Sequence, residues 1–207
     1  MPEGRTSRRS DGGRARFAAI AHGVLLATSS TACLELPRPR EAASTLEPRD
    51  VKATSLSIDT ACVPSGVERC FDALDDNCNG IIDEGCGLQT GLLQFTIAWT
   101  EPADVDLRVT GPDGAVAEAA QPTRSGLLLE RDCKGTTDCH GQNVENVYLA
   151  EGWPRRGRYV VTVRLSDPRE AALPVRVRFS ARVGQRVLTG IALLEEPKDE
   201  KSFELTL

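Results

Sequence analysis

Residues 92–110, which read LLQFTIAWTEPADVDLRVT, decide the fold class. Apolar and polar side chains alternate through this stretch in two successive runs. The apolar positions are Leu93, Phe95, Ile97 and Trp99, followed by Val105, Leu107 and Val109. Because successive side chains of a strand point to opposite faces of a sheet, this period of two predicts two β-strands, each with one buried face.

The same alternation returns further along the chain. The turn sequence Gly111–Gly114 precedes a return strand that we expect at Ala115–Ala119. Four more strands are expected over Tyr159–Leu165, Val175–Val183, Arg186–Leu194 and Ser202–Leu207. No stretch of residues 91–207 keeps a helical period over three turns. Residues 91–207 therefore predict an all-β, antiparallel domain, a sandwich or a barrel.

The N-terminus has the three parts of an export signal. Five arginines lie within the first 16 residues, Phe17–Ala27 is mostly apolar, and small residues at 28–32 lead to Cys33. This order predicts a signal peptide over residues 1–32. The apolar stretch is shorter than the roughly 20 residues that a membrane-spanning helix needs.

Cys33 stands where a bacterial lipoprotein carries its lipidated cysteine, and the residues before it resemble a lipobox. Ser30 departs from the leucine that is usual there, and ordinary cleavage after Ala32 is the alternative. We expect an outer-membrane lipoprotein of the cell envelope, held at the membrane by its N-terminal lipid, or an extracellular protein. Residues 33–60 contain three prolines and no aromatic residue, so we expect a disordered tether, with a short strand allowed at Val51–Ile58.

The chain has seven cysteines, and setting Cys33 aside leaves an even number for pairing. These six are Cys62, Cys70, Cys78, Cys86, Cys133 and Cys139. Residues 61–88 form a small cysteine-rich module. It has too few apolar side chains for a core of its own, so its fold requires disulfide or metal cross-links. Disulfides are expected after export, and three pairings of the first four cysteines stay open. The alternative for Cys133 and Cys139 is a zinc site with His140.

An acidic loop in this module, DDNCNGIIDE at residues 75–84, has the spacing of a calcium loop. Oxygen-bearing side chains stand at alternate positions, and Gly80 permits the sharp turn that follows them. The predicted calcium ligands are Asp75, Asn77, Asn79, the carbonyl of Ile81, Asp83 and Glu84. The alternative is an Asx-rich turn that holds no ion.

The segment resembles the MopE-type metal-binding repeat of secreted bacterial proteins. The matching positions are Glu68, Cys70, Asp72, residues 75–80, Ile82, Asp83, Glu84 and Cys86. Asn77 and Asn79 replace aspartates, and Cys86 stands where a helix-flanked calcium loop has a bidentate Glu, so we expect weak calcium binding of roughly 10⁻⁴–10⁻³ M. The link to copper that the resemblance implies does not carry over, because the loop offers hard oxygen donors and no His.

The C-terminal region resembles the YfaP-type β-sandwich domain. The resemblance is carried by Trp99, residues 103–109, 111–114, 145–149 and 157–163. It implies an exported immunoglobulin-like sandwich with no assigned catalysis. Arg108 stands where many members of that family have His.

A second calcium site is predicted on this domain, because Asp104 and Asp106 share one strand face and repel each other unless a cation lies between them. Its other expected ligands are Asp132, Glu145 and Asn146. The alternative is a solvated strand face paired with arginine. Arg176, Arg178 and Arg182 form a basic row that we interpret as a charged outer sheet face.

Composition and motifs favour a non-enzymatic role. The net charge of −5 gives no reason to expect nucleic acid, and no common catalytic motif is present. We expect a calcium-binding structural or adhesive envelope protein whose partner is a glycan or another envelope protein. The alternatives are a carbohydrate-binding module with Trp153 and Tyr148 as platforms, or a small hydrolase or protease inhibitor that presents the Cys133–Cys139 loop.

Overall fold

The computed structural model describes residues 46–53, 57–59, 62–118, 121–134, 139 and 141–207. All of them belong to one compact unit, Pro37–Leu207. The predicted signal peptide, Cys33 and His140 lie outside the described residues. Within the part that is described, no helix has the length and apolar character needed to cross a membrane.

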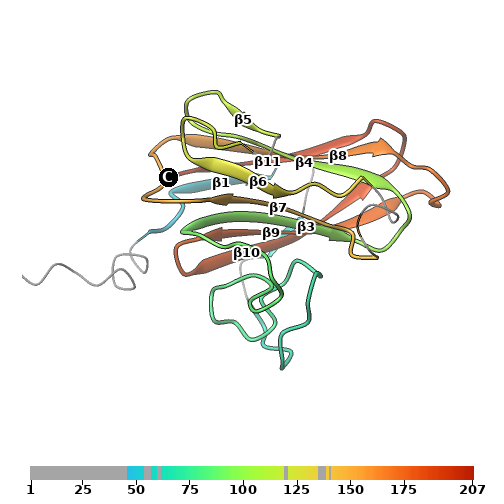
Figure 1. The fold of residues 1–207 in the computed structure, drawn as a ribbon, viewed down its shortest axis with the longest axis horizontal. Helices are drawn as coiled ribbons and strands as arrows, with labels where there is room; N and C mark the ends of the chain where they lie inside the picture. The colour runs from blue at the N-terminus through green and yellow to red at the C-terminus, as the bar shows by residue number, and fades with distance from the viewer. Residues whose placement is uncertain (1–45, 54–56, 60–61, 119–120, 135–138, 140) are drawn as a thin grey trace, which may run out of the picture. The chain divides into compact units, whose positions relative to one another are not determined.

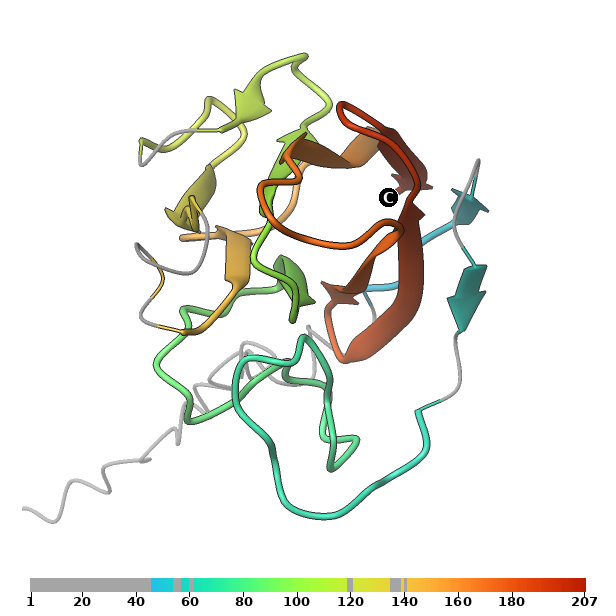
Figure 2. The same cartoon turned by 90° about the vertical axis from the view of Figure 1, so that its right-hand side faces the viewer.

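Two antiparallel sheets pack as a sandwich, which confirms the predicted fold class (Figures 1 and 2). The first sheet has the order β1 (Asp50–Ala53), β11 (Glu200–Thr206), β8 (Arg158–Asp167), β4 (Asp104–Thr110) and β5 (Val116–Ala117). The second has the order β2 (Ser57–Asp59), β10 (Arg186–Leu194), β9 (Val175–Val183), β3 (Leu93–Trp99), β7 (Val144–Leu149) and β6 (Leu127–Arg131).

The core lies between the two sheets and is built from the predicted apolar faces. The inward residues of β3 and β4 are all buried. Phe179 of β9 and Phe203 of β11 meet across the core with ring centroids 4.5 Å apart. Removing this apolar surface from water, at about 25 cal/mol per Å², is the main force that holds the sheets together.

The polar face of β3 is also buried, which the alternation alone did not predict. Gln94 and Thr96 are both 0% exposed. Their side chains bond to Asn146 of β7, with Thr96 Oγ1 donating to Asn146 Oδ1 at 2.9 Å. They are buried because residues 62–90 pack over this outer face of the second sheet (Figure 1).

The end of the predicted tether belongs to the sandwich. Strand β1 pairs with β11 at the edge of the first sheet, and strand β2 pairs with β10 at the edge of the second (Figure 2). Leu46, Val51 and Ile58 pack against the core. The domain therefore begins before the cysteine-rich module, and the tether prediction over 33–60 is corrected at these strands. Strands β1 and β2 form because the edges of β11 and β10 offer free backbone hydrogen-bonding groups. The two strands are too short for an alternating pattern to predict them.

Strands β6 and β7 were not predicted as strands from the alternation. In β7, Glu145 and Asn146 are consecutive polar residues, and both are buried. Two adjacent buried polar side chains break the expected period of two, so the strand could not be recognised from polarity alone.

Tyr159 forms a tyrosine corner at the start of β8. Its ring is 1% exposed, and its hydroxyl donates to the carbonyl of Arg155 at 2.7 Å. Burial raises the pKa of Tyr159 to about 12. A hydroxyl that reaches back to the backbone a few residues upstream is a hallmark of immunoglobulin-like sandwiches.

Replacing Tyr159 by Phe should lower the free energy of unfolding by about 1 kcal/mol, because the Arg155 carbonyl loses its partner while the ring still fills the core. Urea denaturation of the two proteins measures the difference. Tyr148→Phe is the matched control, since that tyrosine is only partly buried and no side-chain hydrogen bond is described for it. Equal destabilisation by both substitutions would contradict the role of the corner.

Candidate metal centre

Disulfides close the cysteine-rich module in a crossed arrangement. Cys62 pairs with Cys78 and Cys70 pairs with Cys86, each at a sequence separation of 16. On the chain-entropy model each such loop stabilises the fold by about 3 kcal/mol. Cys133 pairs with Cys139, so neither sulfur remains as a thiolate for the alternative zinc site. Three disulfides indicate maturation in an oxidising, extracytoplasmic compartment.

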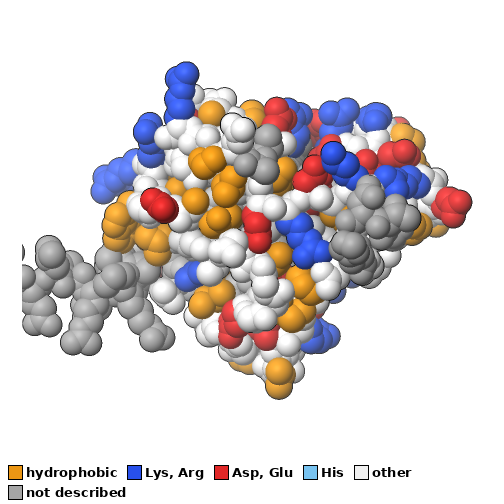
Figure 3. Space-filling view, viewed as in Figure 1, with side chains coloured by type: hydrophobic (Ala, Val, Ile, Leu, Met, Phe, Trp, Pro, Cys, Tyr) orange, Lys and Arg blue, Asp and Glu red, His pale blue; other side chains and the backbone are white. Residues whose placement is uncertain are grey.

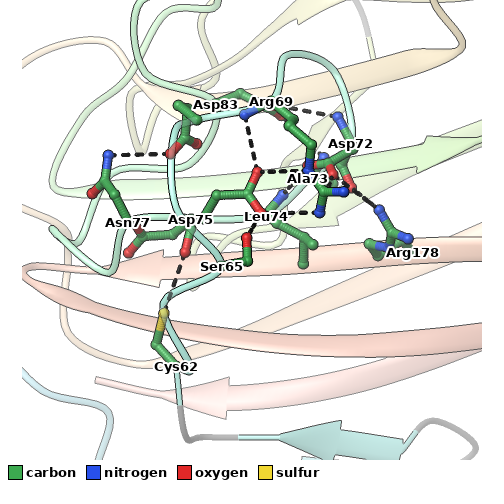
Figure 4. Close-up of polar contacts among 12 residues, drawn as sticks. Cys62, Ser65, Arg69, Asp72, Ala73, Leu74, Asp75, Asn77, Asp83 and Arg178 are labelled. Carbon is green, nitrogen blue, oxygen red and sulfur yellow. Dashed lines mark hydrogen bonds and ion pairs between the residues drawn. The ribbon is translucent and has the colours of Figure 1, made fainter.

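The module is held on the sandwich by polar contacts from β9. Ser180 Oγ donates to the carbonyl of Ala73 at 2.5 Å, and this contact is buried. Arg178 donates to the carbonyl of Asp72 at 3.1 Å and lies 3.3 Å from its carboxylate (Figure 4). Arg182 Nη1 donates to Thr90 Oγ1 at 2.6 Å. Of the three arginines in the predicted basic row, Arg178 therefore binds the module, and Arg182 binds the segment that follows it.

Within the module, the Asx positions organise a tight turn. The Asp75 carboxylate accepts hydrogen bonds from the backbone N–H groups of Asn79 at 3.0 Å and Gly80 at 2.8 Å. Gly80 has φ 87°, and a Cβ atom there would lie 2.6 Å from the carbonyl oxygen of Gln185. Only glycine meets both conditions. The turn is thereby pressed against the β9–β10 connection.

An acidic cluster lies beside this turn. Glu68, Asp75 and Glu84 each present a carboxylate oxygen, and these three oxygens lie within 4.8 Å of one another. Among the oxygens of the two glutamates, Glu68 Oε1 and Glu84 Oε2 are buried and have no hydrogen-bond partner. The amide nitrogen of Asn77 lies between the two glutamates, 2.7 Å from Glu84 Oε1 and 3.3 Å from Glu68 Oε2. We call these three carboxylates the acidic cluster.

The electrostatics of the acidic cluster disfavour three free negative charges. Burial raises the pKa of Glu68 to about 7, and the charges of Glu84 and Asp75 add to the effect. Buried like charges need a proton or a cation for compensation. Calcium binds oxygen at about 2.3–2.6 Å, so two ligands on opposite sides of one ion lie about 5 Å apart. The spacing of the acidic cluster meets that limit.

The structure brings some of the predicted loop ligands together and separates others. Asp75 and Glu84 belong to the acidic cluster, and Asn77 touches it through its amide nitrogen. Asn79 and Ile81 lie in the turn, where the Ile81 N–H donates to Asn79 Oδ1 at 2.9 Å. The third carboxylate, Glu68, was not predicted as a ligand. Its only sequence signal was its place in the motif that resembles the MopE-type repeat.

Asp83, another predicted ligand, is not among the three residues of the acidic cluster. It is 1% exposed, and its carboxylate accepts from the N–H groups of Asp72 at 3.2 Å and Ala73 at 3.1 Å. Burial raises the pKa of Asp83 to about 6, although these hydrogen bonds oppose the shift. The backbone of residues 72–73 needs acceptors, and Asp83 supplies them instead of facing the acidic cluster.

The second predicted calcium site is only partly assembled. Asp106, Asp132 and Glu145 line a cavity of about 330 Å³, together with Arg108 and Arg164. In the described part of the chain, the acidic cluster is the one group of three acidic side chains with oxygens in mutual ligand range. Burial raises the pKa of nearby Asp104, and the negative charge of Asp106 raises it further.

Two of the residues predicted for this second site have other partners. Glu145 accepts from the N–H of Leu107 at 2.6 Å and of Cys133 at 3.1 Å, so both of its oxygens are in use. Asn146 faces the opposite side of the sheet, because neighbouring residues of a strand alternate, and it donates to Glu130 at 2.7 Å. In this structure Glu145 and Asn146 thus make hydrogen bonds that support the fold.

Comparison of the chain with protein-family models, curated proteins and solved structures found no match. The class of the protein is defined by its own features. It is a two-sheet antiparallel sandwich whose outer face carries a disulfide-closed module with an acidic cluster.

Glu145→Gln should flatten the pH dependence of stability. Burial raises the pKa of Glu145 well above its ordinary value, against the hydrogen bonds from Leu107 and Cys133. The folded protein therefore binds a proton that the unfolded chain releases above about pH 4.5, and the free energy of unfolding falls as pH rises, by up to about 1.4 kcal/mol per unit. Urea denaturation across pH measures this slope.

The matched control for this titration is Glu118→Gln. Glu118 lines the same cavity, but it is exposed and pairs with Arg108 at 2.8 Å. Its substitution should leave the pH slope as it is in the wild type. A Glu145→Gln profile parallel to the wild-type profile would exclude Glu145 as the titrating group.

Proposed function

We propose that this protein is an exported, non-enzymatic component of the bacterial cell envelope whose acidic cluster binds calcium, in a structural or adhesive role. The observation that carries the proposal is the pair of buried, unpartnered oxygens, Glu68 Oε1 and Glu84 Oε2, beside the carboxylate of Asp75. A buried carboxylate oxygen without a donor is costly, and a bound cation would remove that cost.

The chemistry of the donors favours calcium over other common metals. The acidic cluster offers carboxylate oxygens and no imidazole, and the nearby sulfurs are joined in disulfides. Zinc and copper prefer nitrogen and sulfur ligands, whereas calcium takes oxygen ligands in flexible geometry. Magnesium demands a near-ideal octahedron, which three carboxylates on an irregular loop do not prescribe.

Calcium at this position would stabilise the module. Glu68 precedes the turn, while Asp75 and Glu84 lie at its two ends, so one ion would cross-link three parts of a segment with little core. Binding to the folded state alone stabilises it by RT ln(1 + [L]/Kd), or about 1.4 kcal/mol at a tenfold excess over Kd. Weak affinity is sufficient outside the cell, where extracellular calcium modules bind at roughly 10⁻⁴–10⁻³ M.

The envelope location and the lipid anchor on Cys33 belong to the same proposal. Support comes from the signal-like N-terminus, from the six paired cysteines and from the resemblance to MopE-type and YfaP-type exported proteins. The partner in this role would be a glycan or another envelope protein. The proposal assigns no catalytic step to any residue.

Asn77→Asp should raise the calcium affinity by on the order of tenfold, because it replaces an amide donor between two glutamates by a further carboxylate ligand. Glu68→Gln should have the opposite effect and remove most of the calcium-dependent rise in melting temperature. Calorimetric titration and thermal unfolding with calcium measure both effects on the oxidised protein.

Asn79→Asp is the matched control for charge. It makes the same substitution two residues away, at an exposed position whose side chain bonds to the Ile81 N–H. It should change the calcium affinity much less than Asn77→Asp. If millimolar calcium leaves the melting temperature of the wild type unchanged, the metal proposal fails.

Cys33→Ser should abolish lipidation and release the processed protein from the membrane fraction. Labelled palmitate, followed by fractionation of the producing cells, measures both consequences. A wild-type protein that is exported without incorporating label would exclude the anchor. N-terminal sequencing of that protein would then locate the actual cleavage site.

A further inference from the structure

One end of the sandwich gathers the start of the described chain and its C-terminus. The Arg49 N–H donates to the carbonyl of Thr206 at 2.7 Å. Gly157 and Leu207 exchange two backbone hydrogen bonds, of 3.1 and 3.0 Å. The loop before β8 and the segment that begins at residue 46 therefore both contact the C-terminal residues of the chain.

Three loops complete this end. A Cβ atom on Gly157 would lie 2.7 Å from Pro112, and one on Gly111 would lie 2.5 Å from Ser125 Oγ, so these loops touch. The Ala150 N–H donates to the carbonyl of Gly126 at 3.2 Å. We call the surface formed by residues 46–49, 111–114, 123–126 and 150–157 the tether end.

The tether end carries arginines that have no acidic partner among the described residues. These are Arg49, Arg124, Arg155 and Arg156, and all of them are exposed. At the opposite end some of the positive charges are paired, as in Lys134 with Asp132 at 3.6 Å and Lys201 with Asp199 at 3.0 Å. In Figure 3, separate Lys and Arg side chains project at the left-hand end of the molecule, whereas at the right-hand end Lys and Arg are interspersed with Asp and Glu.

The acidic side chains of the tether end do not balance these arginines. Asp113 and Glu151 are exposed in its loops. Glu47 is paired with Arg186, 3.8 Å away. Among the described side chains, four arginines thus stand against two acids without an ion pair, so these side chains carry an excess of positive charge.

A tryptophan projects from the same surface. Trp153 is 54% exposed, whereas the other tryptophan of the chain, Trp99, is 5% exposed and lies in the core. Pro154, the next residue, is buried and holds the loop against the domain. An exposed indole beside arginines is suited to the boundary between lipid headgroups and acyl chains, where its apolar body and polar N–H are both accommodated.

We propose that the tether end lies on a membrane surface that contains anionic phospholipid, with the arginines on lipid phosphates and Trp153 at headgroup level. The lipid anchor proposed for Cys33 would bring this end to the membrane, and to that extent the inference rests on the proposed function. The 13 residues from Cys33 to Leu46 reach at most about 45 Å when fully extended. The anchor therefore keeps this end of the sandwich within reach of the bilayer.

The test uses the compact unit Pro37–Leu207, which holds all six paired cysteines and has neither the leader nor Cys33. Sedimentation measures its partition onto vesicles of phosphatidylcholine, alone or with about 30% phosphatidylglycerol, an anionic lipid. Binding is expected only to the anionic vesicles and should weaken in high salt. Each arginine near an anionic surface contributes about fivefold to partition, so Arg124→Gln, Arg155→Gln and Arg156→Gln together should weaken binding by roughly a hundredfold.

The matched control removes three positive charges from the opposite end, by Lys134→Gln, Arg169→Gln and Arg176→Gln. All three side chains are exposed, and this variant should bind nearly as the unmodified unit does. Tryptophan emission gives a second measurement. Anionic vesicles should shift it to shorter wavelength, and Trp153→Phe should remove that shift, because Trp99 is already buried.

Three results would overturn the inference. They are absence of binding to anionic vesicles, equal loss of binding in the two triple variants, and an emission shift that persists in Trp153→Phe. Absence of binding combined with cross-linking of the tether end to an envelope protein would assign this surface to a protein partner instead. Labelling of Cys33 is measured separately, so a failure here is distinguishable from a failure of the anchor.

Discussion

Two crossed disulfides are the constraint on which the candidate site depends. Between Cys62 and Cys86, Ala73 and Ile82 are the apolar side chains that the sandwich and the module fully bury. So small an apolar contribution does not offset the entropy of ordering the segment. Cross-links reduce that entropy by restricting the unfolded chain. The disulfides can then hold the carboxylates of the acidic cluster close together, although little apolar surface is buried in this segment.

The outer face of the second sheet supplies the other half of the constraint. Ser180 and Arg178 bind the carbonyls of Ala73 and Asp72, so the segment is fixed to β9 by its backbone. Gly80 presses against the β9–β10 connection at Gln185. A change in the conformation of the acidic loop is therefore transmitted to the sandwich, and the module and the sandwich should unfold together.

Alternation predicted the strands that have one apolar face, namely β3, β4 and β8 to β11. It failed where pairing or burial came from elsewhere in the fold. Strands β1 and β2 exist because they complete two sheet edges, and β7 buries Glu145 and Asn146 on opposite faces. At the site, spacing identified Asp75 and Glu84. It could not show that the Asp83 carboxylate accepts hydrogen bonds from backbone N–H groups, because those contacts depend on the folded loop and not on the spacing.

The resting state of the acidic cluster follows from Asn77. Its amide donates to both glutamates and lowers their mutual repulsion without adding charge. A proton on Glu68 supplies further compensation, but with a pKa of about 7 that proton is only partly bound near neutrality. An aspartate at residue 77 would place four carboxylates together and increase their mutual repulsion. Asparagine avoids that fourth charge, and the two unpartnered oxygens of the glutamates remain where the calcium ion proposed above would bind.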